Sequence, residues 1–301
     1  MATVQRSIED TFNFTKTLHH DTYEFISPKR VDVYGKSVFI TGASKGIGRE
    51  TALSFAKAGC DKIAIGARSD LSSVVGDIKE AARKAGHTRE PKVLSFKLDV
   101  TDENSIKAAA ETISKEFGGK LDVMVNNAGY LHDWRPLCDA LTSTWWAHYE
   151  VNVKGVFLCS KYFVPLLLES EFKTLVITSS MGAAVVIPGA SSYQSSKLAA
   201  VRIAEFIATE YEDKGIICFA IHPGAVKTEL ANNMPEHQHK ILVDEPRMPA
   251  DSTLWLTSER RPWLNGRFIV TNWDMEELEA RKDEIVKKDL LKFRLTTAFE
   301  G

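Results

Sequence analysis

The chain has 301 residues, of which 44% are hydrophobic and 26% are charged, and its formal net charge is −2. This composition is ordinary for a globular protein, and the length allows a sizeable core. It provides no excess of Lys and Arg for holding nucleic acid or an anionic membrane, so we expect neither partner.

The cysteines, the histidines and the N-terminus carry no signal for a metal site or for export. The four cysteines lie far apart, without the spacing of a zinc site, and are expected to be buried thiols. His237 and His239 lack an evident third ligand, and a mobile polar lid over Asn232–Glu245 is the favoured interpretation. No stretch resembles a signal peptide, and no run approaches ~18 apolar residues. We therefore expect a cytoplasmic protein with no bound metal.

Short apolar runs alternate with helical patterns after residues 1–35, an arm without clear periodicity that is expected to lie over the domain surface. Each run is nearly continuous, as in strands that are buried on both faces. The expected strands are Ser37–Thr41, Ile63–Ile65, Val93–Leu98, Leu121–Val125, Leu175–Thr178, Ile216–Ile221 and Phe268–Val270. Helices are expected directly after the first strand and over 70–86, 102–117, 142–169 and 193–213.

This alternation predicts a single α/β domain over residues 36–273. Its expected form is a doubly wound parallel sheet of about seven strands with helices on both faces. The tail, residues 274–301, is charged and carries apolar residues at uneven helical spacing. That pattern indicates a surface helix that packs against the domain or a second subunit.

A glycine-rich turn follows the first expected strand directly, and a helix is expected to begin there. Glycines allow a sharp turn and a close backbone approach to a pyrophosphate, while the N–H groups and dipole of the helix face the anion. The turn in this position therefore predicts a dinucleotide site. Its expected binding residues are Gly42, Ser44, Lys45, Gly46, Ile47 and Gly48.

The end of the second strand favours NADP(H) as the cofactor. An NAD site usually has a carboxylate there for the ribose 2′-hydroxyl, whereas an NADP site has positive charge for the 2′-phosphate. Ala67 occupies the acidic position and Arg68 follows it. Lys45 could join Arg68 on one phosphate. Against this, Asp70 lies close, and both cations could be solvated surface charges.

Ser180, Tyr193 and Lys197 form the candidate catalytic set. Carbonyl reduction needs a hydride donor and a proton for the developing alkoxide. Tyr193 can supply that proton if its pKa, ordinarily about 10, is brought toward neutrality. Lys197 follows on the same helix face, so its ammonium would favour the tyrosinate. Ser180 would hold the substrate oxygen beside the phenol, with Ser179 as the second choice.

Taken together, these motifs resemble the short-chain dehydrogenase/reductase family over residues 36–271. The resemblance is carried by the Gly-x3-Gly-x-Gly turn, by Asn126-Asn127-Ala128-Gly129, by the spacing of Ser180, Tyr193 and Lys197, and by Pro223-Gly224. It implies a Rossmann-like sheet in the strand order 3-2-1-4-5-6-7, and a proton relay that ends on a water held by the backbone of Asn152. The cofactor contacts that it implies beyond the glycine turn and Arg68 are Asp99, Val100, Asn126, Ala128, Gly129, Tyr193, Lys197, Pro223, Gly224, Val226 and Thr228.

The resemblance implies an NADPH-dependent oxidoreductase that reduces a ketone or aldehyde, or runs the reverse reaction. Apolar residues in 130–137, 181–192 and 225–243 indicate a medium-sized, largely nonpolar substrate. Those singled out are Leu131, Trp134, Met181, Val185 and Ile187. The arm and tail look similar to a fungal branch of the family associated with secondary metabolism. A homodimer or homotetramer is also expected, with the subunit contact along the helix at 142–169, which carries Trp145 and Trp146.

Two other functional classes stay open. A non-redox catalyst, such as an isomerase, dehydratase or cyclase, could use Tyr193 as its acid or base. A non-catalytic protein could keep the fold and bind the cofactor. The joint presence of Ser180, Tyr193 and Lys197 favours an enzyme, since a scaffold has no need of all three.

Overall fold

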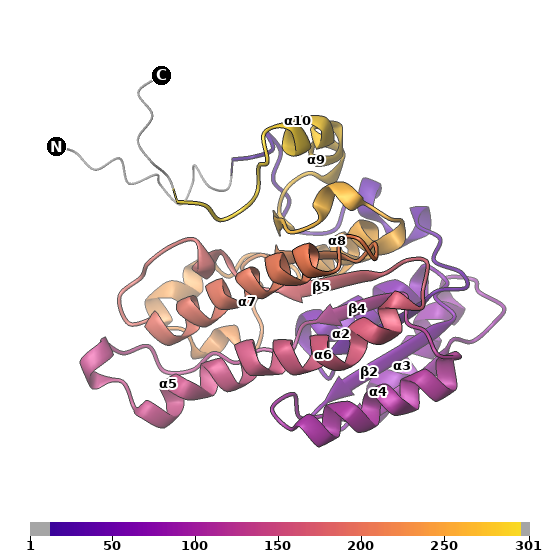
Figure 1. Cartoon of the computed structure of the whole chain (residues 1–301), viewed down its shortest axis with the longest axis horizontal. Helices are drawn as coiled ribbons and strands as arrows, with labels where there is room; N and C mark the ends of the chain where they lie inside the picture. The colour runs from indigo at the N-terminus through magenta and orange to yellow at the C-terminus, as the bar shows by residue number, and fades with distance from the viewer. Residues whose placement is uncertain (1–12, 296–301) are drawn as a thin grey trace.

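A computed structural model describes residues 13–295, and its centre is a seven-stranded parallel sheet in the order β3-β2-β1-β4-β5-β6-β7 (Figure 1). The strands are β1 (Ser37–Thr41), β2 (Lys62–Ala67), β3 (Lys92–Lys97), β4 (Val123–Asn126), β5 (Thr174–Thr178), β6 (Ile217–His222) and β7 (Phe268–Val270). The predicted fold class and strand order are therefore confirmed. β3 forms one edge and contains only exposed and half-buried residues, so it departs from the continuous burial expected of it.

Helices cover both faces of the sheet. One face carries α2 (Gly46–Lys57), α3 (Ser72–Lys84) and α8 (Arg247–Ser258), and the other carries α4 (Glu103–Phe117), α6 (Gly155–Leu168) and α7 (Ser191–Glu210). The side chains of β1 alternate between the two layers, because successive residues of a strand point to opposite faces. Phe39 packs beneath α4 and α6, while Val38 and Ile40 pack against α2 and α3.

The helix predicted at 142–169 is a continuous segment of three parts. It consists of α5 (Thr142–Tyr149), a π-helical turn (Glu150–Lys154) and α6. By length and hydropathy this is the one helix among residues 13–295 that could cross a membrane, but half of its most apolar stretch is buried inside the protein. Its packing against α4 and the sheet is that of a core helix.

The sequence analysis did not predict helix α8. Ten of its twelve residues, Met248–Thr257, are buried, so the helix has no polar face from which a periodicity could be recognised. Pro249 stands within its first turn, where a missing N–H costs nothing. The helix is held in place against α2, where the hydroxyl of Ser54 donates to the carboxylate of Asp251.

The described part of the arm, residues 13–35, and the C-terminal tail lie against each other. Leu18 and Trp273 form an antiparallel bridge, and the ring of Phe14 lies 5.2 Å from that of Trp273. The tail forms two short helices, α9 (Met275–Ala280) and α10 (Lys282–Lys287), instead of the single helix expected. Residues 1–12 and 296–301 of the predicted arm and tail lie outside the described residues.

The amino end of the sheet is tied together by the buried carboxylate of Asp122. Its Oδ2 accepts hydrogen bonds from the backbone N–H and the hydroxyl of Ser37, both at 2.8 Å, and its Oδ1 accepts one from the hydroxyl of Ser170 at 2.5 Å. The group thus joins the start of β1 to the segments before β4 and β5. Removing it would leave the buried Ser37 N–H without its acceptor.

We therefore predict that Asp122→Ala lowers the free energy of unfolding by about 3 kcal/mol, since one buried charged acceptor serves several donors. Urea denaturation measures this change. The matched control is Asp139→Ala at the exposed end of a short 3-10 helix (Leu137–Asp139), which should stay within about 0.5 kcal/mol of the wild type. Equal effects of the two substitutions would contradict the role given to Asp122.

Candidate active site

A groove of about 470 Å³ runs along the carboxyl edge of the sheet, across the ends of β2, β1, β4 and β5. Parallel strands bring the loops that follow them to the same edge, which is where ligands bind in such sheets. Of the predicted cofactor residues, those that line it are Gly42, Ser44, Lys45, Gly46, Ile47, Gly48, Arg68, Asp99, Val100, Ala128, Gly129, Tyr193, Lys197, Pro223 and Thr228.

The glycine turn is held tightly against the end of β4. Gly42 has a φ of +68°, and a Cβ on it would lie 2.8 Å from the Cα of Ala128, so a larger residue would force the two segments apart. The side-chain amide of Asn127 donates to the carbonyl of Thr41 at 3.0 Å. The hydroxyl of Thr41 in turn accepts the N–H groups of Asn127 and Ala128, both at 3.1 Å.

The donor groups along this part of the groove fit a dinucleotide. The first N–H groups of α2, at Gly46 and Ile47, have no acceptor within the helix and point out of its N-terminus, where a pyrophosphate is favoured. Arg68 is exposed at the end of β2, and Ala67 before it is buried. The carboxylate of Asp70 accepts the N–H and hydroxyl of Ser72, so it is engaged at the start of α3.

Lys45 forms an ion pair with Glu229 across the groove. Both side chains are largely exposed, so the pair is weak and can exchange for another anion. Glu229 was not among the predicted site residues. It connects the glycine turn to the segment after β6, and a phosphate near Lys45 would compete with it.

Tyr193 and Lys197 project from the first turns of α7, which begins at Ser191. The ammonium of Lys197 is buried and donates to the carbonyl of Thr178, at the end of β5, at 2.9 Å. Burial lowers the pKa of Lys197 to about 8. This amine therefore changes charge just above neutral pH.

The phenol of Tyr193 lies beside the hydroxyl of Ser180, and burial raises its pKa above the ordinary value while the hydrogen bond to Ser180 partly opposes the rise. The sequence-based expectation was a lowered pKa. The difference arises because burial disfavours the charged form of the phenol. The second-choice serine, Ser179, instead donates to the carbonyl of Lys197 at 2.8 Å and fixes α7 to β5.

Asn152 lies within the π-helical turn, which displaces the regular backbone bonding of the long helix. Its side chain accepts the N–H of Tyr130 at 2.8 Å and donates to the carbonyl of the same residue at 2.9 Å. It also donates to the hydroxyl of Ser196 at 3.0 Å. The residue thereby joins the loop after β4 to α7, next to Lys197.

Five predicted residues lie near the groove without lining it: Asn126, Asn152, Ser180, Gly224 and Val226. The amide nitrogen of Asn126 is buried and has no hydrogen-bond partner among residues 13–295. The groove also has lining residues outside the predicted set, which are Ala67, Ser69, Leu98, Asn127, Val151, Thr178, Ser179, Lys227, Glu229 and Leu230. Most of these flank a predicted residue, so extending each motif by one position would have included them.

The loops expected to form the substrate side meet beyond Tyr193. The N–H of Arg135 donates to the carbonyl of Gly189 at 3.1 Å, which joins the segment after β4 to the one before α7. Leu131 and Met181 are buried, while Trp134, Val185 and Ile187 are partly exposed. None of these five side chains is among the residues that line the groove.

His222 fixes the position of the Ser180 loop. It ends β6, and its Nδ1 accepts the N–H of Met181 at 3.0 Å. Burial lowers the pKa of His222 to about 4, so the ring stays neutral and keeps this acceptor at neutral pH.

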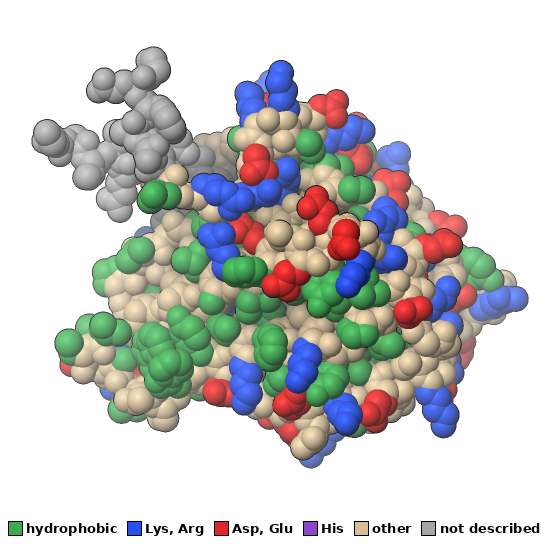
Figure 2. All heavy atoms as spheres, viewed as in Figure 1, with side chains coloured by type: hydrophobic (Ala, Val, Ile, Leu, Met, Phe, Trp, Pro, Cys, Tyr) green, Lys and Arg blue, Asp and Glu red, His purple; other side chains and the backbone are tan. Residues whose placement is uncertain are grey.

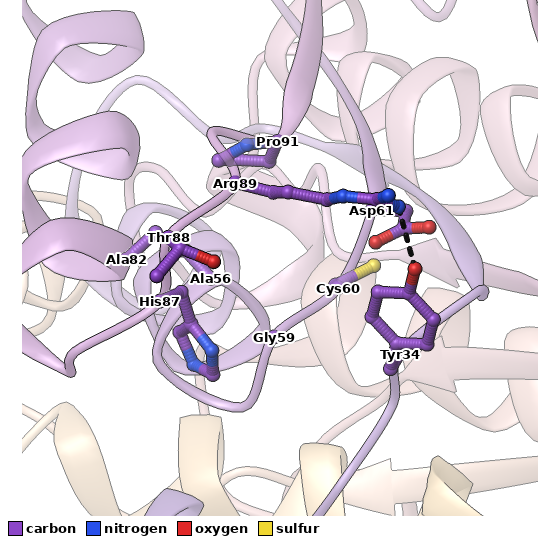
Figure 3. A pocket seen from close by; sticks show the side chains of 10 residues that line it. All are labelled: Tyr34, Ala56, Gly59, Cys60, Asp61, Ala82, His87, Thr88, Arg89 and Pro91. Carbon is purple, nitrogen blue, oxygen red and sulfur yellow. Dashed lines mark hydrogen bonds between the residues drawn. The ribbon is translucent and has the colours of Figure 1, made fainter.

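A second hollow, of about 290 Å³, lies at the amino end of β1, β2 and β3 (Figure 3). Arg89 donates to the hydroxyl of Tyr34 at 2.6 Å across it. The thiol of Cys60 in its wall is buried, and its pKa is raised to about 12, so it is unreactive. Cys159 and Cys218 are also buried as expected, whereas Cys138 is exposed. The hollow thus holds no counterpart of the Tyr193 and Lys197 pair.

Comparison with known proteins identifies the family of the chain. The sequence model of the family described as short chain dehydrogenase matches residues 36–239. The short chain dehydrogenase citE of the fungus Monascus ruber is 47% identical over 284 residues, which cover 94% of this chain and 97% of that protein.

Two solved structures share the fold. A short chain dehydrogenase from Shigella flexneri, complexed with NADP, is 26% identical with a TM-score of 0.67, and the match covers 79% of this chain and 97% of that one. The 3-ketoacyl-(acyl-carrier-protein) reductase from Brucella melitensis, complexed with NADH, is also 26% identical, with a TM-score of 0.70 and coverage of 79% and 96%.

The lowered pKa of Lys197 predicts a specific dependence of stability on pH. Between the folded value of about 8 and the ordinary value of 10.5 the unfolded chain binds more protons than the folded one, so stability from this group rises with pH there. Below pH 8 the amine is charged in both states, so the penalty for burying the ammonium lowers the free energy of unfolding by its full amount. Relative to Lys197→Met, the free energy of unfolding of the wild type should rise by up to about 3 kcal/mol across it. Urea unfolding of both proteins at intervals across this range measures the difference. Parallel pH curves would contradict a buried, charged Lys197.

Proposed function

Because the chain belongs to the short-chain dehydrogenase/reductase family, we propose that it is an NADPH-dependent oxidoreductase that reduces a ketone or aldehyde to an alcohol, or runs the reverse reaction. The observation that carries the proposal is the position of Tyr193, hydrogen-bonded to Ser180 and next to Lys197, at the end of a groove that begins at a helix N-terminus. The two solved structures with this fold are complexes with NADP and NADH, which supports a nicotinamide cofactor in this groove.

The nicotinamide supplies the hydride when it is bound, and the residues of this chain supply the proton. Tyr193 is protonated at neutral pH, which is the form that donates a proton to an alkoxide. Burial raises its pKa in the free protein, so the donation depends on groups that stabilise the tyrosinate. Ser180 holds the carbonyl oxygen next to the phenol. The ammonium of Lys197 then stabilises the tyrosinate as it forms, and Thr178 keeps that ammonium in place.

The preference for NADPH rests on the charges at the adenosine end of the groove. Arg68 is exposed there, and no carboxylate stands at position 67. The acid closest in sequence, Asp70, is engaged by Ser72. Lys45 would leave Glu229 and join Arg68 on the 2′-phosphate, because a dianionic phosphate attracts the ammonium more strongly than one carboxylate does.

The class of substrate is inferred from the loops beyond Tyr193, and the metabolic role from the fungal relatives. The partly exposed apolar side chains of Trp134, Val185 and Ile187, in the loops after β4 and before α7, suit a largely nonpolar carbonyl compound. Fungal relatives along nearly the whole chain support a tailoring step of secondary metabolism. We place the protein in the cytoplasm.

The protein is proposed to form a homodimer or homotetramer through α5, α6 and α7. On this face hydrophobic side chains gather over α5 and along α6 and α7 (Figure 2). Trp146 of α5, Phe157 of α6 and Phe206 of α7 are each more than half exposed. Burying such side chains in an interface between subunits removes apolar area from water.

The cofactor proposal predicts that Arg68→Ala weakens NADPH binding about tenfold or more and leaves NADH binding unchanged, because it removes a charge-assisted contact to the 2′-phosphate alone. Quenching of protein fluorescence by each nucleotide measures both dissociation constants. Arg89→Ala, in the hollow at the amino end of the strands, is the control (Figure 3).

NADPH absorbance is then followed with a panel of ketones and aldehydes. Tight binding without any turnover would favour the non-redox alternative, and no binding would reject the proposal.

The proposed interface predicts that Phe157→Asp reduces the mass in solution toward that of one 33.5 kDa chain, because it places a charge in a desolvated contact. Light scattering after size-exclusion chromatography measures the mass. Tyr34→Asp, at the amino end of the sheet beside α2 and α3 on the other face, should leave it unchanged. A monomeric wild type would rule the interface out.

A further inference from the structure

The segment 225–244, here called the covering segment, runs from the end of β6 past the groove and returns to the start of α8. Lys227, Thr228, Glu229 and Leu230 within it line the groove. Its two ends lie side by side, because Val226 and Asp244 form a parallel bridge and the N–H of Asp244 donates to the carbonyl of Ala225 at 3.1 Å. The covering segment is therefore a loop that is closed at its base.

One buried carboxylate fixes that base. The side chain of Asp244 is 3% exposed, and its Oδ2 accepts the N–H of Ala225 at 2.5 Å and the side-chain amide of Asn272 at 3.0 Å. The same residue that ends the covering segment thus holds its beginning, and ties both to the segment after β7. Charged hydrogen bonds of this kind are stronger than neutral ones.

Asp244 also explains why residue 224 is a glycine. The sequence analysis had assigned Gly224 to the cofactor site. A Cβ on Gly224 would lie 2.6 Å from the Oδ2 of Asp244, and the residue has a φ of +83°. Only glycine allows the carboxylate to approach this closely and the chain to turn here. The glycine thereby supports the base of the covering segment, while Pro223 lines the groove.

The N-terminal arm completes the structure around Asp244. The Nδ1 of His20 lies 2.5 Å from the Oδ1 of Asp244, and the carbonyl of His20 accepts the N–H of Glu245 at 2.8 Å. The arm also reaches Asn272, whose side-chain amide donates to the carbonyl of His19 at 3.0 Å. Both oxygens of the carboxylate are therefore engaged, one by the arm and one by the base of the covering segment.

We propose that Asp244 and His20 are positioning residues that hold the covering segment over the groove, so that the arm takes part in cofactor binding. His20, Asp244 and Asn272 all lie outside residues 36–239, the part of the chain that matches the family. The proposal rests on the proposed function in one respect, namely that the groove binds a dinucleotide. A loose covering segment would have to be ordered on binding, and that loss of conformational entropy weakens affinity.

The first test compares His20→Ala with His19→Ala. His19 belongs to the same arm, stacks on Tyr23 and bonds to Asp274, so its loss disturbs the arm without touching Asp244. His20→Ala should raise the dissociation constant of NADPH about fivefold, the value of one hydrogen bond, and speed tryptic cleavage after the exposed Lys240 of the free protein. His19→Ala should change neither. Equal effects of the two variants, or none from His20→Ala, would overturn the proposal.

The second test uses Asp244→Asn, which keeps the shape of the side chain and removes its charge. The KM for NADPH should rise about tenfold or more, with kcat at saturating NADPH within about twofold of the wild type. A loss of kcat or of thermal stability with an unchanged KM would show a merely structural role. If the wild type itself binds no nucleotide, the proposed function fails, and the rate of cleavage after Lys240 still decides whether Asp244 and His20 hold the covering segment.

Discussion

All seven strands of the sheet run parallel, and this constraint brings residues from distant parts of the chain to one edge. The loops after β1, β4, β5 and β6 meet there, and each contributes a different group to the groove. The two layers of helices bury the apolar strands, so the edge is held rigidly by a core that extends through the domain. Precise placement of reacting groups needs such a rigid base.

Within that frame, the chemistry depends on two opposed effects of burial. Burial lowers the pKa of Lys197 and raises that of Tyr193, because it disfavours the charged form of each group. Both therefore titrate outside their ordinary ranges in the free protein. The phenol remains a proton donor at neutral pH, and the carbonyl of Thr178 keeps the ammonium close enough to act once the phenol begins to lose its proton.

Local patterns in the sequence were sufficient to predict the strands and the glycine turn, because each depends on neighbouring residues. The strand order depends on pairings between distant segments, and it was predicted only through the resemblance to the family. Helix α8 was missed because its burial on nearly all sides removes periodicity. The raised pKa of Tyr193 depends on packing around α7, and the role of Asp244 depends on contacts between segments more than two hundred residues apart. Neither is encoded in a short motif.

The most direct test of the account is the turnover of Tyr193→Phe with NADPH and a carbonyl substrate that the wild type reduces. The account predicts a loss of kcat of about a thousandfold, the scale of general acid catalysis, with NADPH affinity nearly unchanged. Tyr149→Phe, on α5 and stacked on Trp145, serves as the control. Turnover by Tyr193→Phe close to that of the wild type would contradict the assignment of Tyr193 as the proton donor.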